Sequence, residues 1–248
     1  ESICYRYTED REIYVEDCPL YESTATVAYA YEGEYSGSIV VPDQVIYNNK
    51  TYKVVSIERN AFQGHPITSL SITNNITGGI NLSKCYNLKV LKAHAYFISN
   101  AIGLWDTNLE EVYYTGGYVG YVIRIPSLKV IDLSLTENTE LYRSLFREDA
   151  DGNYEGFYNL RKLVLPNGLT TIYERQFREL WSLEEIVIPN GVTEIPDGAF
   201  YGCRSLTSIV IPDSVTSIGS MAFWYCDSLT SIEIPDSVTS IGYSAFDC

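Results

Sequence analysis

Short runs of alternating apolar and polar residues recur along the chain, and each run ends in a turn. Within residues 206–212, Ile209 and Ile211 fall on one side of an extended strand, and Val210 falls on the other side. Pro212 cannot donate a hydrogen bond to a strand ladder, so it ends the strand, and the Pro-Asp-Ser sequence is typical of a tight turn. The pattern therefore predicts short strands separated by turns.

The runs repeat with a fixed period in the C-terminal part of the chain. Residues 165–187, 188–210 and 211–233 can be written in one frame, C-x-x-L-x-x-I-x-I-P-x-x-V-x-x-I-x-x-x-A-F, and each unit is 23 residues long. Residues 234–248 begin a fourth unit. Such a period indicates a solenoid in which each repeat forms one coil.

The frame continues upstream in a weaker form and gives about nine coils in total. Two steps between coils are long, because residues 45–54 form a hairpin pattern with an Asn-Asn turn and residues 136–153 form a charged insert. The first apolar residues of the predicted strands are Ile39, Leu70, Leu91, Val112, Ile131, Leu163, Ile186, Ile209 and Ile232.

One coil is not stable alone. It buries about six apolar side chains, each worth roughly 1.5–3 kcal/mol, while ordering each residue costs about 1–2 kcal/mol. Stability must therefore come from stacking coils on one another. We expect parallel strands on one face and short helical turns, such as Ala222-Phe223, on the other face. Residues 1–38 lack the repeat and alternate like a β-hairpin, which predicts a cap over the first coil.

The frame A-F-x-x-C-x-x-L-T-S-I-x-I-P resembles the BspA-like, or Treponema pallidum-type, leucine-rich repeats. Residues 188–246 carry the resemblance most closely, and it extends in weaker form from Ile39. It implies an α/β, β-rich, right-handed leucine-rich-repeat solenoid with no catalytic residues. The expected domains are the cap, 1–38, and the solenoid, 39–248, with irregular coils at about 91–159 and regular coils at 163–248. It also implies an extracellular or cell-surface location, including lipid anchoring to an outer membrane.

Composition narrows the range of partners. The 17 Lys and Arg residues against 32 Asp and Glu residues give a net charge of −15, which disfavours nucleic acid and anionic membrane surfaces. No run of about 18 apolar residues predicts a transmembrane segment. The first residues show no signal-peptide pattern, so we expect that any targeting segment is absent from this chain.

The cysteines have two expected roles. Cys85, Cys203 and Cys226 each precede a coil leucine by three residues, which predicts a structural ladder of buried residues inside the solenoid. Free thiols suit this ladder better than a disulfide, because stacked neighbours that point the same way have poor bridging geometry. Cys4 and Cys18 are candidates for a disulfide across the N-terminal hairpin, and the residues alone leave that pairing open.

No pattern indicates catalysis, a metal or a cofactor. His65 and His94 are 29 residues apart, lack zinc-ligand spacing, and are expected to be surface loop residues. The sequence 149–155 lacks the full calcium-loop pattern and fits an exposed turn better. The pairs at 110–111 and 184–185 are adjacent along strands, so a glycosidase pair would need carboxylates from different coils. We predict a chain that is not an enzyme.

Binding is expected on the outward side of the strands. Val164, Val187 and Val210 form an apolar stripe, which fits either ordinary strand propensity or a docking surface. Tyrosines gather in the irregular coils, where they serve either recognition or coverage of shortened coils. The candidate ligand-binding residues are Lys92, Glu111, Tyr113, Tyr114, Tyr118, Tyr121, Asp132, Lys162, Val164, Val187, Val210 and Glu233.

Two functional classes follow from this surface. The favoured class is protein–protein interaction or adhesion with a partner on a host or bacterial surface. The alternative is carbohydrate binding, in which exposed Tyr and Trp rings stack on glycan faces. A purely structural surface-layer role and a hydrolase are the less favoured classes.

Overall fold

The computed structural model describes residues 2–7, 13–18, 24–27, 35–47, 49–72, 76, 79–120, 122, 125–142 and 157–247. Contacts divide the chain into two compact units, Glu1–Gly116 and Gly117–Cys248, here called unit 1 and unit 2. The regular elements of both units are mainly short strands, and turns and irregular segments join them. The described residues include one α-helix, α1 (Ala95–Ser99), and one 3-10 helix, Leu104–Asp106, both in unit 1.

Unit 1 begins with a five-stranded sheet of order β2-β1-β3-β6-β5. Strands β1 (Ser2–Tyr7) and β2 (Ile13–Cys18) pair antiparallel, as the N-terminal hairpin pattern predicts. Strand β3 (Thr24–Val27) lies parallel between β1 and β6 (Lys50–Ile57), and β6 pairs antiparallel with β5 (Gln44–Tyr47). The predicted hairpin at residues 45–54 is therefore confirmed, and it belongs to the same sheet as the leader strands.

The backbone register of β1 and β2 bears on the candidate disulfide. Cys4 lies opposite Glu16, and Cys18 lies opposite Ser2, so the two cysteines are not directly paired across the strands. Their side chains lie outside the described part of the structure, and the disulfide stays a prediction.

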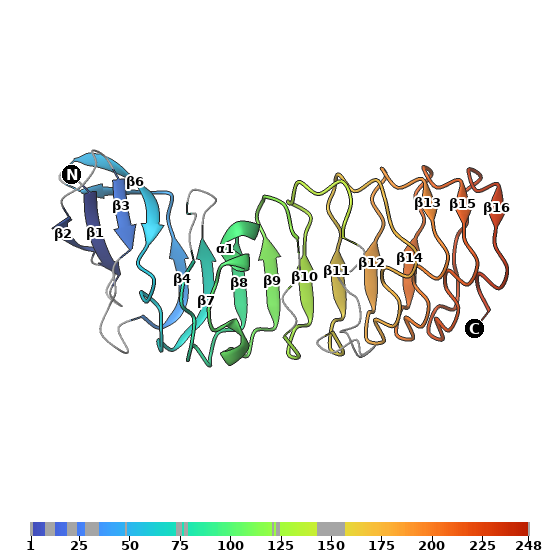
Figure 1. Ribbon diagram of the computed structural model, residues 1–248, viewed down its shortest axis with the longest axis horizontal. Coiled ribbons are helices and arrows are strands. Elements are labelled where there is room, and N and C mark those ends of the chain that lie inside the picture. The colour runs from blue at the N-terminus through green and yellow to red at the C-terminus, as the bar shows by residue number, and fades with distance from the viewer. Residues whose placement is uncertain are drawn as a thin grey trace. The chain divides into compact units, whose positions relative to one another are not determined.

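Unit 1 continues as a parallel ladder in which strands from successive coils lie side by side (Figure 1). The strands are β4 (Gly37–Val41), β7 (Ile67–Ile72), β8 (Val90–Ala93) and β9 (Glu111–Tyr114). Alternation places one set of side chains in the core and the other outside. The predicted inward residues are in register and at most 6% exposed: Ile39, Leu70, Leu91 and Val112.

Unit 2 repeats this arrangement with shorter strands. Its parallel strands are β10 (Val130–Asp132), β11 (Lys162–Val164), β12 (Glu185–Val187) and β14 (Ser208–Val210). The inward residues are again in register: Ile131, Leu163, Ile186 and Ile209. A second parallel ladder joins β13 (Glu194–Ile195), β15 (Ser217–Ile218) and β16 (Ser240–Ile241). The result is a β-rich solenoid with almost no helix.

The segments that carry Ala-Phe are turns, and the expectation of short helical turns there is wrong. Met221 and Tyr225 have positive φ angles of 55° and 58°, which interrupt a right-handed helix. The backbone groups of the turn bond instead to the next coil, as in Phe200 N–H to Ala222 O at 2.8 Å and Phe223 N–H to Ala245 O at 2.8 Å. Each turn therefore needs a neighbouring coil to satisfy its amides.

Stacked aromatic rings fill the core behind these turns. Phe177, Phe200, Phe223 and Phe246 stack one on the next, with ring centroids 5.3, 5.2 and 5.3 Å apart. The first three rings are fully buried. Such a ladder repeats the same contact between successive regular coils and links them through their side chains.

The predicted ninth strand does not form. Residues 229–239 are not in a strand, and β14 is the last strand of its ladder. Ile232 is half-buried, whereas Ile209 is 7% exposed. A strand of three residues depends on ladder bonds and on packing from both sides, and among the described residues no coil packs on the outer side of this segment. The expected alignment of Ile232 with Ile209 is therefore wrong, although that of Ile186 with Ile209 is confirmed.

Candidate binding surface

The outward residues of the parallel strands in unit 2 form two rows, here called the unit 2 strand surface. Strand register, and not chance proximity, aligns the members of each row. One row carries charge at its centre: Val130, Lys162, Glu185 and Ser208. The other row is mostly apolar: Asp132, Val164, Val187 and Val210.

Ion pairs link neighbouring coils in the charged row and beside it. Lys162 Nζ lies 2.9 Å from Glu185 Oε1, and Arg161 Nη1 lies 3.3 Å from Glu184 Oε1. All four side chains are 44–62% exposed. Exposed ion pairs contribute only about 0–1 kcal/mol to stability, so exchanging these contacts for contacts with a partner would cost the fold little.

The apolar row becomes more exposed toward the C-terminal coil. Val164 is partly buried, Val187 is 53% exposed and Val210 is 72% exposed. A single exposed valine is unremarkable, but a contiguous row on a rigid ladder is a feature of docking surfaces.

The strand surface of unit 1 is more polar. Lys92 on β8 is exposed, and the Tyr113 hydroxyl on β9 donates to Glu111 Oε2 at 2.7 Å. Val40 on β4 is 64% exposed and lies opposite Ser71. These outward positions agree with the predicted alternation, so Lys92, Glu111 and Tyr113 are placed where a partner could reach them.

The predicted tyrosine cluster is only partly present on the surface. Tyr114 is 2% exposed and shares the inward side of β9 with Val112, so its assignment to the binding surface is wrong. Tyr118 is 70% exposed but belongs to unit 2, whereas Tyr113 belongs to unit 1. Tyr121 lies outside the described residues. Burial therefore removes Tyr114 from the candidate surface, and a common site for the other three tyrosines stays a prediction.

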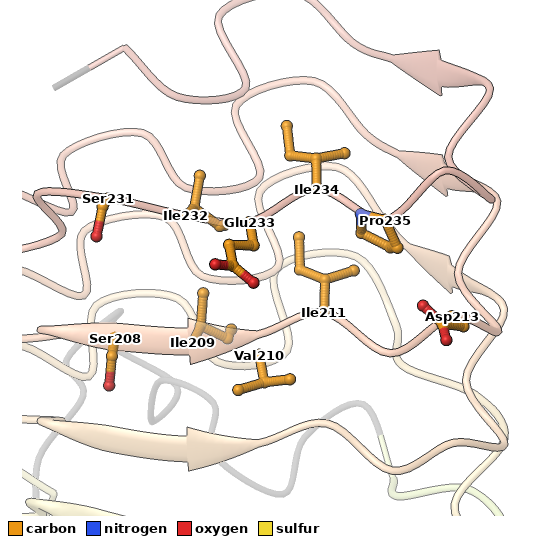
Figure 2. A pocket seen from close by; sticks show the side chains of 10 residues that line it. All are labelled: Ser208, Ile209, Val210, Ile211, Asp213, Ser231, Ile232, Glu233, Ile234 and Pro235. Carbon is orange, nitrogen blue, oxygen red and sulfur yellow. The ribbon is translucent and has the colours of Figure 1, made fainter.

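A groove lies at the C-terminal end of the unit 2 strand surface (Figure 2). It has a volume of about 500 Å³ and runs between β14 and the segment 231–235. Val210 and Glu233 from the sequence prediction line it, together with Asp213, Ile211 and Ile234, which the prediction missed. No sequence signal distinguishes this place, because residues 208–212 and 231–235 occupy the same frame positions.

A second group that the prediction missed lies on the turns. Tyr201, Trp224 and Tyr225 contact one another, with ring centroids 5.1–5.8 Å apart, and the Arg178 guanidinium lies 4.9 Å from the Tyr201 ring centre. The repeat could have predicted this group, because three of its members each directly follow a phenylalanine of the aromatic ladder: Arg178, Tyr201 and Trp224. A separate pair, Tyr158 and Trp181, lies 5.8 Å apart with both rings over 40% exposed.

The cysteine ladder is present as predicted. Cys85, Cys203 and Cys226 form no disulfide and are buried, and each thiol donates to a phenylalanine carbonyl of the preceding coil at 2.9–3.2 Å. Burial raises the pKa of the Cys203 thiol well above its ordinary value, and the neighbouring Cys226 raises it further. Burial also raises the pKa of Cys85, although backbone hydrogen bonds partly oppose the effect. These thiols are structural and unreactive.

The histidines differ from expectation in one case. His65 is fully buried, accepts the Tyr35 amide at Nδ1 over 3.3 Å, and contacts the Tyr35 ring, so its prediction as a surface residue is wrong. His94 caps α1 by accepting the Tyr96 amide at 3.2 Å. Within the described residues, no group of three His, Cys, Asp or Glu side chains could hold a metal ion. The sequence 149–155 lies outside that part.

Stacked coils, parallel strands and in-register apolar ladders define the class of protein, a β-rich solenoid built from repeats. Its particular type follows from sequence. Residues 150–248 match the family model described as the BspA type leucine rich repeat region, in six copies, so this part of the chain carries leucine-rich repeats of this type. A search of curated proteins finds no match.

Several solved structures are similar to the chain. A leucine rich cell surface protein from Faecalibacterium prausnitzii is 19% identical, covers 90% of this chain and 91% of its own, and has a TM-score of 0.34. The leucine rich repeat protein of T. pallidum is 21% identical over 92% and 87%, with a TM-score of 0.33. The pneumococcal vaccine antigen PcpA is 17% identical over 93% and 80%, with a TM-score of 0.33.

Long apolar helices are absent from the described part of the chain, where neither helix has the length to cross a bilayer.

Proposed function

We propose that the chain is a non-catalytic, cell-surface or secreted binding module that contacts a protein partner through the unit 2 strand surface. The observation that carries the proposal is the apolar row ending in Val187 and Val210, which stands exposed beside the row containing the Lys162–Glu185 pair. A partly apolar centre with charged residues around it is the composition of protein interfaces. The family match supports an interaction role in general terms.

The size of the surface defines how the partner must approach. Four strands spaced about 4.8 Å apart and three residues long cover roughly 15 by 10 Å. A stable interface buries about 800 Å² on each partner. The partner must therefore also contact the turns that follow the strands, and the rigid ladder supplies only the centre of the footprint.

The test uses a panel of purified extracellular proteins immobilised on a biosensor. For each binder, we compare the full chain with Val187→Lys and Val210→Lys, which place a charge in the apolar row. The matched control is Tyr243→Lys, because Tyr243 is 79% exposed and follows β16 in the other ladder. We expect a loss of about tenfold or more in affinity from either valine change, as for interface residues that matter, and no change from the control. Binding that survives both valine changes would contradict the proposal.

Carbohydrate binding is the second candidate, supported by a different surface. Tyr158 and Trp181 form an exposed aromatic pair on neighbouring coils, and such rings stack on sugar faces. A glycan array separates the two candidates. Glycan binding that is lost in Trp181→Ala and kept in Val187→Lys would assign the function to the aromatic pair instead of the strand surface.

A further inference from the structure

The charges on the unit 2 strand surface change sign between two neighbouring strands. Lys162 on β11 lies in register with Glu185 on β12. The residues just before them repeat the contrast, because Arg161 and Glu184 also occupy one frame position on successive coils. The surface is therefore positive on one rung and negative on the next, at two positions along the strand direction.

These four side chains pair within the chain but keep bonding capacity for a further partner. Each printed ion pair uses one carboxylate oxygen, Oε1 of Glu185 and Oε1 of Glu184. An ionised carboxylate accepts at two oxygens, and an ammonium group has three donors. All four side chains are 44–62% exposed. A second set of charges could therefore bind them from outside without breaking the pairs that exist.

A second copy of the chain supplies a matching set when it lies face to face with the first. The relevant twofold axis runs parallel to the strands, midway between β11 and β12. Such an axis keeps the strand direction and reverses the order of the rungs, so β11 of each copy lies over β12 of the other. Lys162 then faces Glu185 of the second copy, and Arg161 faces Glu184 of the second copy. Every charge of this set meets its opposite.

Other positions of the axis on this ladder do not match. An axis over β11 sets Lys162 against its own copy, and an axis over β12 does the same with Glu185. Between β10 and β11, Lys129 would face Arg161, a like charge at the same frame position. Between β12 and β14, Glu185 would face the uncharged Ser208. Among the four strands, the axis between β11 and β12 is the one that sets opposite charges against each other.

The apolar row supplies the centre of the same contact. The axis sets Val164 against Val187 of the second copy, and Val187 is 53% exposed in the single chain. It also leaves the strands of the two copies parallel, within the roughly 30° at which aligned sheets pack. The rim matches less well, because Val210 faces Asp132 there. The contact is thus an apolar centre with complementary charges beside it, as in protein interfaces.

Net charge favours this place over others for contact between two copies. The chain carries a net charge of −15, so two copies repel each other in general. The four charged residues described above sum to zero, and the surface is locally neutral. The strands alone cover less than the roughly 800 Å² of a stable interface. We therefore expect a reversible dimer with a dissociation constant in the micromolar range.

We propose that the unit 2 strand surface binds a second copy of this chain, in a face-to-face dimer about the axis between β11 and β12. The inference rests on the proposed function, because the same surface serves both, and it names one partner by its chemistry. The dimer covers Val187. Self-association and the binding of another protein through this row therefore exclude each other.

The test measures the mass of the full chain by sedimentation equilibrium under reducing conditions, over a range of concentrations. Lys162→Glu and Glu185→Lys each set like charges against each other across the axis, and each should weaken the dimer by about tenfold or more. The matched control is Glu194→Lys, which makes the same change in net charge at an exposed residue of β13, in the other ladder. It should not weaken the dimer. Circular dichroism verifies that each variant is folded.

A mixture of the two variants separates contact across the axis from effects within one chain. Both changes break the ion pair within the chain, so loss of the dimer alone does not locate the axis. In an equimolar mixture, the carboxylates of Lys162→Glu face the ammonium groups of Glu185→Lys at both positions. The heterodimer should form with about the affinity of the wild-type dimer. The double variant, which exchanges the two charges, should dimerise as well.

Three results would overturn the inference: a chain that stays monomeric at every concentration, a dimer that Glu185→Lys does not weaken, or a mixture that forms no heterodimer. A dimer that Glu194→Lys abolishes would belong to the other ladder and would overturn it too. The proposed function can survive this failure. A panel protein whose binding is lost in Val187→Lys, with a wild-type chain that stays monomeric, would support the proposed function and reject the dimer.

Discussion

Replacing Phe200 with alanine removes the centre of the aromatic ladder in unit 2. Its ring is fully buried and stacks on Phe177 at 5.3 Å and on Phe223 at 5.2 Å. A buried Phe→Ala change costs about 3–5 kcal/mol, because it removes apolar contacts and leaves a cavity. Two ring contacts, each worth roughly 0.5–1.5 kcal/mol, are lost with it. We therefore expect a cost in the upper half of that range, about 4–5 kcal/mol.

The same change at Phe246 is the matched comparison. Phe246 is half-buried and, within the described residues, stacks on a single ring, that of Phe223 at 5.3 Å. Half of the contacts and a partly solvated site predict a cost of about 2 kcal/mol. Urea unfolding followed by far-ultraviolet circular dichroism gives the free energy of unfolding for each variant.

The difference between the two variants tests the reasoning more strictly than either value alone. If stability comes from contacts between neighbouring coils, a ring with two neighbours must matter more than a ring with one. A cost for Phe200→Ala equal to or below that for Phe246→Ala would refute this argument. A cost of about 1 kcal/mol or less would show that the ring is not in a packed core.

Three further changes probe other contacts between coils. Gly219→Ala should destabilise the chain by several kcal/mol, because the added Cβ would lie 2.5 Å from Asp197 N. The control is Gly168→Ala, which should cost about 1 kcal/mol or less, because no atom lies nearer than 3.9 Å to the added Cβ. Equal melting temperatures for the two variants would contradict this argument. Gln176→Ala should cost about 1–3 kcal/mol of stability, because the Gln176 side-chain amide donates to Leu141 O and Tyr142 O at 3.2 Å each. A Gln176→Glu variant that unfolds like the wild type would show that this donation does not stabilise the fold. The raised pKa of Cys203 keeps its thiol protonated in the folded state, so its contribution to stability is fully present below about pH 9 and falls above that pH, by up to about 1.4 kcal/mol per pH unit. Urea unfolding at pH 8 and at about pH 10 measures this effect. Between the two pH values, the free energy of unfolding should fall less in Cys203→Ala than in the wild type, and an equal fall in both would contradict the prediction.

The regular coils were predictable because the repeat dictates both period and alternation. A 23-residue spacing places Ile186 and Ile209 on neighbouring rungs, and strand alternation then puts Val187 and Val210 outside. The same alternation was available for β9, where Tyr114 must share the side of the inward Val112. Its burial is therefore predictable from the strand pattern, which outweighs the aromatic composition of the coil.

Three features were not predictable, because distant residues determine them. Ile232 and Ile209 occupy the same frame position, and only the absence of ladder bonds separates them. His65 is buried by Tyr35, which lies 30 residues away along the chain. The Ala-Phe turns have helix-compatible composition, but their amides bond to the next coil, an arrangement that no single repeat can reveal.

The candidate surface also has a part that the sequence predicts and a part that it does not. The two outward rows of unit 2 follow from the period, and the structure aligns them as expected. The groove depends on a local gap between two nearly identical segments, so the period argues against it.

The central claim is that successive coils stack in register and display Val187 and Val210 side by side on an open surface. Pyrene labels on cysteines placed at these two positions test it directly, in a chain whose other accessible cysteines are replaced. The account predicts strong excimer emission for this pair, because neighbouring strands are about 4.8 Å apart, and little for a pair at Val187 and Tyr243. Excimer emission that is absent at 187 and 210, or equal in both pairs, would contradict the account.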